Sequence, residues 1–110
     1  MYTEDFEKII WRDALVCIDF LTGWDPSCRT MRKRLDRFQQ QMLGRVELYH
    51  IDVDDRNLER ILHRLEIVSV PTVVFFHRGE ELWRETGLRS PEHLLRVLDE
   101  LEKRIRIDQH

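Results

Sequence analysis

Residues 14–28 are ALVCIDFLTGWDPSC, a near-continuous apolar run followed directly by a helix start. The run Ala14–Phe20 is rich in residues that favour β-structure, which is typical of a central strand covered on both faces. Asp25 and Pro26 then predict the first residues of a helix, because Asp is a preferred N-cap and Pro is favoured at the first helical position. A buried strand that leads directly into a helix is typical of an α/β domain.

The helix predicted to begin at Pro26 has its apolar residues at steps of three and four, which places them along one face. These residues are Cys28, Met31, Leu35, Phe38 and Met42. Gly44 is the expected end of the helix. Alternating apolar and polar residues predict a second strand at Val46–Ile51, and the acidic loop Asp52–Asp55 follows it. A strand, a crossover helix and a second strand form a right-handed βαβ unit with a parallel strand pair.

A short helix and a β-hairpin follow the acidic loop. The helix is predicted at Asn57–Leu65, where four apolar residues share one face. The apolar run Val73–Phe76, the turn Arg78–Glu80 and the alternating segment Glu81–Glu85 predict the hairpin. Because the hairpin adds two antiparallel strands to the parallel pair, we expect one mixed sheet of four strands.

Helices are also predicted at both ends of the chain. Thr3 is the expected cap of a short first helix. Ser90 and Pro91 begin the last helix, whose apolar residues keep helical spacing as far as Ile105. We expect residues 106–110 to form a frayed end. Helices on both faces of the mixed sheet make the expected fold an α/β sandwich of three layers.

Length and composition restrict the class of protein. The 110 residues suffice for a single domain, 1–110, with its core at about 3–105. A net charge of −3 argues against nucleic acid as a partner. No apolar run reaches the ~20 residues of a membrane span, and the acidic start is unlike a signal peptide, so we expect a cytoplasmic protein that does not bind membranes. The two cysteines and unpaired histidines do not match a zinc site, and we expect a monomer without metal or cofactor.

Several short motifs follow one another along the chain. They are Asp19-Phe20, Trp24-Asp25-Pro26-Ser27-Cys28, Val70-Pro71-Thr72, Phe75-Phe76, Arg78-Gly79-Glu80 and Thr86-Gly87. Their order and spacing resemble those of a thioredoxin, and the resemblance covers about Thr3 to Glu102. It implies a thioredoxin-like fold without the initial strand that many thioredoxins place before the first helix.

The chain departs from the thioredoxin pattern at its reactive motif. Thioredoxins carry Trp-Cys-x-x-Cys at the start of the second helix, whereas Asp25 stands here at the position of the nucleophilic cysteine and Cys28 at that of the resolving one. A dithiol centre needs one thiolate to attack a disulfide and a second thiol to resolve the product, so we do not expect dithiol turnover. The segment also resembles locally the thioredoxin-like component of the spliceosome, which acts by binding partners.

Two residues are candidates for catalysis. Asp19 occupies the position where thioredoxins keep a buried acid that shuttles a proton to the resolving cysteine, here Cys28, and His50 stands where a lysine often pairs with that acid. The alternatives are structural: Asp19 as a hydrogen-bonded core carboxyl, and Cys28 as an inert buried residue. Cys17 lies within the strand and is expected to belong to the core rather than to pair with Cys28.

Five residues are candidates for peptide binding. The resemblance implies a cis bond between Val70 and Pro71, where the residue before the proline offers its backbone to an extended substrate peptide. With Trp24, Pro71, Gly87 and Leu88, this segment would make a small apolar patch around the site. Asp25 would lie beside it, either as a helix cap or as a permanent mimic of a thiolate.

These features support two hypotheses of function. The first is a redox-inactive module, binding or chaperone-like, that holds a protein or peptide in the cis-proline groove. The second is a single-cysteine thiol-disulfide oxidoreductase or redox sensor that acts through Cys28. A basic run on the second helix would favour partners with acidic segments. Its residues are Arg29, Arg32, Lys33, Arg34 and Arg37.

Overall fold

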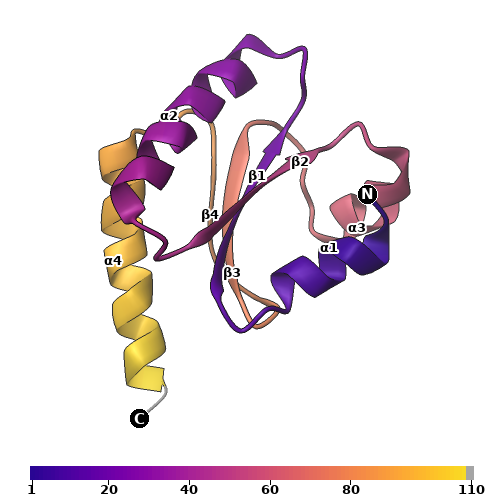
Figure 1. The fold of residues 1–110 in the computed structure, drawn as a ribbon. Helices are drawn as coiled ribbons and strands as arrows, with labels where there is room; N and C mark the ends of the chain where they lie inside the picture. Colours follow the sequence, from indigo (N-terminus) through magenta and orange to yellow (C-terminus); the bar gives the residue numbers. More distant parts are fainter. Residues whose placement is uncertain (109–110) are drawn as a thin grey trace.

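The computed structural model describes residues 1–108, and its helices and strands follow the predicted order (Figure 1). The elements are α1 (Thr3–Ile10), β1 (Leu15–Leu21), α2 (Pro26–Met42), β2 (Glu47–Asp52), the 3₁₀ helix η1 (Arg56–Leu58), α3 (Glu59–Arg64), β3 (Thr72–His77), β4 (Glu80–Thr86) and α4 (Pro91–Asp108). In the described part of the chain, no helix combines the length and the apolarity that crossing a membrane requires.

The four strands form one mixed sheet in the order β2-β1-β3-β4. β1 pairs with β2 in parallel, whereas β1 with β3 and β3 with β4 are antiparallel. Helices α2 and α4 cover one face of the sheet, and α1 and α3 cover the other (Figure 1). The predicted fold class, a four-stranded mixed sheet between two layers of helices, is therefore confirmed.

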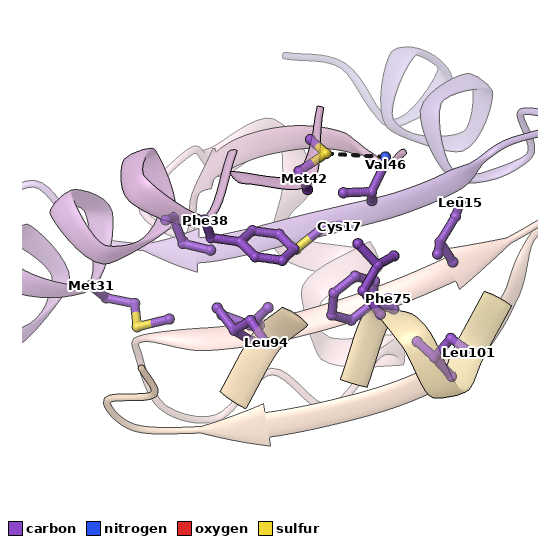
Figure 2. Packing of buried hydrophobic residues seen from close by; sticks show 12 residues of the cluster. Leu15, Cys17, Met31, Phe38, Met42, Val46, Phe75, Leu94 and Leu101 are labelled. Atoms are coloured by element: carbon purple, nitrogen blue, oxygen red, sulfur yellow. Dashed lines mark hydrogen bonds between the residues drawn. The ribbon is translucent and has the colours of Figure 1, made fainter. Parts of the chain in front are cut away.

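Each face of the sheet has its own apolar core, because neighbouring residues of a strand point to opposite faces. Leu15 and Cys17 of β1 pack on the side of α2 and α4, while Val16, Ile18 and Phe20 pack on the side of α1 and α3. Figure 2 shows the first cluster, in which β1, β3, α2 and α4 all contribute buried side chains. The expectation that Cys17 belongs to the core is confirmed, since its side chain is fully buried.

Two predicted helix boundaries are wrong at the level of one residue. Tyr2, not Thr3, occupies the N-cap position of α1, and the Thr3 hydroxyl instead donates to the carbonyl of Asn57, 3.2 Å away. Helix α2 ends at Met42 rather than at Gly44, because Leu43 already has the left-handed conformation with φ 49°. Gly44 continues this left-handed turn with φ 77°.

Two other predicted helices also differ from their observed form. The segment expected as one helix at 57–65 is divided into η1 and α3, because the Asp55 carboxylate accepts from the Asn57 N–H and starts a tight turn. Ser90 caps α4 as predicted, its hydroxyl accepting the His93 N–H at 3.1 Å. Helix α4 continues to Asp108, so a frayed end from residue 106 is wrong for 106–108, and residues 109 and 110 lie outside the described residues.

Candidate functional site

Three connecting segments meet at one end of the sheet, the upper end in Figure 1. Phe20 of β1 is paired with Thr72 of β3, and Thr72 with Thr86 of β4. The loop after β1, the segment before β3 and the loop after β4 therefore leave the sheet together. These segments carry every residue that the sequence proposes for peptide binding, namely Trp24, Asp25, Val70, Pro71 and Gly87.

Asp25 caps helix α2. Its backbone is extended, with φ −88° and ψ 122°, and its carboxylate accepts the Ser27 N–H at 2.7 Å. Its carbonyl oxygen accepts the first bonds of the helix, from Cys28 at 3.1 Å and Arg29 at 3.3 Å. The capping interpretation thus matches the geometry, with Pro26 at the first helical position as expected.

Cys28 lies in the first turn of α2 with its side chain directed inward. The residue is only 2% exposed, and the Thr22 N–H donates to its Sγ at 3.4 Å. Cys28 and Cys17 are both free thiols, so no disulfide joins them. Burial, and secondarily the charge of Asp19, raises the pKa of the Cys17 thiol well above its ordinary value. Neither sulfur is presented to solvent.

Asp19 is a fully buried carboxylate on the face of the sheet that α2 covers, since it alternates with Leu15 and Cys17 along β1. Its Oδ2 lies 2.8 Å from Nδ1 of His50, whose side chain is 21% exposed. Its Oδ1 is buried and has no hydrogen-bond partner among residues 1–108, and the same holds for the Thr22 hydroxyl. The structure thus pairs Asp19 with His50, the contact that the resemblance implied.

The segment before β3 contains a cis peptide bond between Val70 and Pro71. The Gly87 N–H donates to the Pro71 carbonyl at 2.8 Å, which ties this segment to the loop after β4. Pro71 is buried and Val70 is half-buried. Among residues 1–108, no hydrogen bond engages the backbone N–H or C=O of Val70.

Each of the three segments that meet at this end of the sheet carries a large, exposed apolar side chain. Trp24 is 71% exposed, Val68 91% and Leu88 41%, and each belongs to one of the three segments that meet here. The indole N–H of Trp24 donates to Oδ2 of Asp54 at 3.0 Å, which fixes one edge of the ring. We call this area, formed by Trp24, Val68, Val70, Gly87 and Leu88, the Val70 surface.

Sequence reasoning missed Val68, Asp54 and Thr22. The sequence carries no signal of the exposure of Val68, because a single apolar residue in a loop can equally be buried. The contacts of Asp54 and Thr22 depend on the course of two loops, which residue patterns do not encode. No group of three or more His, Cys, Asp or Glu within residues 1–108 is arranged to hold a metal ion.

A mixed sheet between two helical layers, with a buried cysteine in the first turn of α2, defines a thioredoxin-fold protein. The thioredoxin family model matches residues 1–100. The chain belongs to the thioredoxin family.

Individual relatives agree with this assignment. Thioredoxin M3, chloroplastic, of Oryza sativa subsp. japonica is 29% identical over 93 residues, which cover 84% of this chain and 52% of the relative. The chain therefore spans about half the length of that relative. Thioredoxin-1 of Saccharomyces cerevisiae is 28% identical over 83 residues, covering 76% of this chain and 78% of the relative.

Solved structures share the fold at similar or lower identity. The crystal structure of thioredoxin from Trypanosoma brucei brucei superposes with a TM-score of 0.81 at 22% identity, covering 92% of this chain and 86% of the other. Chloroplastic thioredoxin z superposes with a TM-score of 0.80 at 25% identity, covering 94% and 92%.

Proposed function

We propose that this protein binds extended segments of other proteins at the Val70 surface and does not turn over disulfides with a dithiol pair. The proposal rests on the contacts and burial of Asp25 and Cys28, the two residues at the motif positions. Asp25 uses its carboxylate to cap α2, and Cys28 is buried with its sulfur accepting the Thr22 N–H. A surface without an exposed thiolate is suited to binding rather than to thiol exchange.

The mode of binding follows from the backbone of Val70. A peptide that lies antiparallel to this segment would accept from the Val70 N–H and donate to its C=O, as in β-augmentation. Trp24, Val68 and Leu88 would cover apolar side chains of the peptide, because they are the large exposed apolar side chains of the three segments that meet at this end of the sheet. This mode needs no sulfur chemistry.

A peptide-binding measurement tests the proposal directly. The probe is a fluorescein-labelled 15-residue peptide with a central Val-Thr-Val-Thr-Val segment, followed by anisotropy. We expect saturable binding, lost when alternate backbone nitrogens of the central segment are methylated, because methylation removes the N–H groups that pair with Val70. Leu88→Ala and Trp24→Ala should each weaken binding, and the matched control Leu43→Ala, at a distant exposed leucine, should not. Equal binding of the methylated peptide would contradict strand addition.

A second candidate function is thiol chemistry at Cys28. It is favoured by one contact: the Thr22 N–H, from the loop after β1, donates to Sγ at 3.4 Å, and a backbone donor beside a sulfur at the N-terminal end of a helix stabilises a thiolate. In that reaction the Cys28 thiolate would attack a partner disulfide, forming a mixed disulfide and releasing one partner thiolate. Asp19, on the face covered by α2, would govern the proton.

Alkylation separates the two candidates. In a Cys17→Ala variant, iodoacetamide labelling of Cys28 is followed by mass spectrometry as pH is raised. We expect no labelling until the protein unfolds, since the side chain is 2% exposed. Fast labelling of the folded protein with an apparent pKa below about 7.5 would favour the thiol enzyme instead, because an ordinary cysteine titrates near ~8.5.

Restoring the missing thiol tests how much of the redox surface remains. Asp25→Cys is expected to gain disulfide reduction in an insulin-precipitation assay, because it recreates the paired cysteines of the family motif. Asp25→Ser is the matched control, since serine keeps a capping oxygen but adds no thiol. Insulin reduction by the unaltered protein at a rate similar to that of Asp25→Cys would refute the absence of dithiol turnover.

A further inference from the structure

The solvent face of α2 carries four cations in its first three turns. Arg29, Arg32, Lys33 and Arg37 are all exposed and lie opposite the buried stripe of the helix. None of the four forms an ion pair with another residue in the range 1–108. We call this set the α2 cationic face.

The cations on α2 do not lie in its last turn, where the electrostatics of a helix would favour them. A helix is stabilised by acids in its first turn and bases in its last. Helices α1 and α4 follow this rule, with Glu4 or Glu92 in the first turn and Lys8 or Arg106 in the last. Helix α2 has no acid in its first turn and no base in its last. Asp25 supplies the negative charge at the N-terminal end of α2, and no cation lies in its last turn, so interaction with the helix dipole does not account for the cations.

A further cation lies at the Val70 surface. The Arg89 side chain donates to Glu85 at 2.8 Å and to the Leu88 carbonyl at 2.8 Å, which holds it beside Gly87. Its Nη1 lies 3.5 Å from the position that a Cβ on Gly87 would take. The Arg89 carbonyl accepts from Arg34 of α2 at 3.5 Å, so this loop adjoins the helix.

We propose that the α2 cationic face docks an acidic stretch of the polypeptide whose extended part lies on the Val70 surface. The inference rests on the proposed function and names its partner class. Unpaired cations beside a binding surface attract carboxylates at long range, and they repel basic segments. The whole chain has a net charge of −3, so this positive area is local and does not suit a long polyanion such as a nucleic acid.

Three forms of the same peptide test the proposal. The central Val-Thr-Val-Thr-Val segment is flanked on one side by four glutamates, four glutamines or four lysines. At low salt we expect the glutamate form to bind about tenfold more tightly than the glutamine form, as expected for a few exposed charge pairs. The lysine form should bind most weakly. At 0.5 M NaCl the preference should fall to about twofold or less, because salt screens exposed charges beyond a few ångströms.

A matched pair of variants assigns the preference to the α2 cationic face. Arg29→Gln, Arg32→Gln, Lys33→Gln and Arg37→Gln together remove four charges from this face. Arg56→Gln, Arg60→Gln, Arg96→Gln and Arg106→Gln remove the same number from exposed positions elsewhere. We expect the first variant to lose the glutamate preference and to keep its urea midpoint or raise it. The second should keep the preference.

The outcomes separate this inference from the proposed function. Equal binding of the glutamate and glutamine forms would overturn the acidic partner and leave strand binding intact. Failure of all three peptides to bind would overturn both. Loss of the glutamate preference in both variants would show that the total charge of the protein determines it. That result would overturn its assignment to the α2 cationic face. Tighter binding of a single-stranded oligonucleotide than of the glutamate peptide, abolished by the first variant only, would assign the face to nucleic acid instead.

Discussion

Asp25 shows how one carboxylate serves the fold at the start of α2. Its side-chain oxygen satisfies the Ser27 N–H, and its carbonyl accepts the first two bonds of α2. Both roles depend only on local geometry and follow from the Asp-Pro sequence alone. The residue is thus accounted for by helix capping, without a reaction.

The contribution of this cap is measurable. Asp25→Ala is expected to lower the free energy of unfolding by about 1 kcal/mol, since it leaves the Ser27 N–H without an acceptor. Asp25→Asn is the control, because an amide oxygen still caps the helix. Urea denaturation followed by circular dichroism gives both values. Equal stability of the alanine variant and the unaltered protein would rule out a capping role.

Glu85 of β4 forms hydrogen bonds with Arg89 of the loop before α4 and with His93 of α4. Its Oε2 lies 2.8 Å from Nε of Arg89 and 2.7 Å from Nε2 of His93. Partial burial alone would raise the pKa of Glu85, but the hydrogen bonds from His93 and Arg89 outweigh it and hold the pKa below its ordinary value. The folded protein therefore binds this proton less readily than the unfolded chain does.

The sign of the pH dependence follows from that shift. The contribution of Glu85 to stability is fully present above its unfolded pKa of about 4.5 and is lost as pH falls through the lower folded value. Glu85→Gln is expected to be less stable than the unaltered protein at pH 7 and nearly equal to it at pH 2.5. Urea midpoints at the two pH values test this. A stability difference that grows on acidification would contradict the assigned shift.

Contacts within the site differ in how far the sequence predicts them. The resemblance to thioredoxins predicted the pairing of Asp19 with His50. The two residues lie opposite each other in the register of the paired strands β1 and β2. The Thr22 N–H on Cys28 and the Trp24 contact with Asp54 were not predictable. They arise where loops leave the sheet, and loop conformation has no periodic signal in the sequence.

At the scale of the helix or strand, the predictions were right where the side chain and the backbone of neighbouring residues favour the same structure. Asp25 and Ser90 cap their helices as expected, because each precedes a proline that fits the first helical position. Thr3 and Gly44 failed for opposite reasons. The Thr3 hydroxyl donates to the Asn57 carbonyl instead of capping α1. Leu43 adopts the left-handed conformation that a glycine was expected to provide.

The hairpin between β3 and β4 depends on a glycine. Gly79 has φ 82°, and its N–H donates to the Ile10 carbonyl at 2.8 Å. A Cβ at this position would also overlap the Trp11 indole. Gly79→Ala is therefore expected to lower the unfolding free energy by about 1–2 kcal/mol.

Gly23 provides the matched control for this substitution. A Cβ there meets no atom within 4 Å, and its φ lies outside the range that L-residues avoid. Gly23→Ala should leave the urea midpoint nearly unchanged, measured beside Gly79→Ala. Equal losses in the two variants would show that helix α1 and the hairpin are not joined as described.

At the scale of the whole molecule, the two apolar clusters share the strands that separate them. Leu98 of α4 lies in one cluster and Leu58 of η1 in the other, and both are buried. We expect Leu98→Ala and Leu58→Ala each to lower stability by about 2–5 kcal/mol within a single transition. Tryptophan fluorescence and circular dichroism should give coincident urea curves. Separate transitions would show two independent folding units.

The overall architecture was the most predictable level. The period of apolar residues distinguishes strands from helices, and the handedness of crossover connections leaves few topologies for a βαβ unit followed by a hairpin. The near-continuous apolar runs in β1 and β3 indicate strands covered on both faces, and these are the two inner strands. The resemblance placed Leu88 in an apolar patch beside Val70, but the sequence could not predict the exposure of Val68, since this depends on the course of the loop before β3.

The strand order also determines how the protein avoids aggregation. The outer strand β4 carries Glu80, Glu81 and Arg84, and charged edges hinder pairing with a foreign strand. β3, next to it, is TVVFFH, a segment with strong β-propensity, no acidic residue and no proline. Detachment of β4 would uncover this segment as a template for intermolecular sheets. Substitutions that loosen β4 should therefore reduce solubility before they abolish the remaining fold.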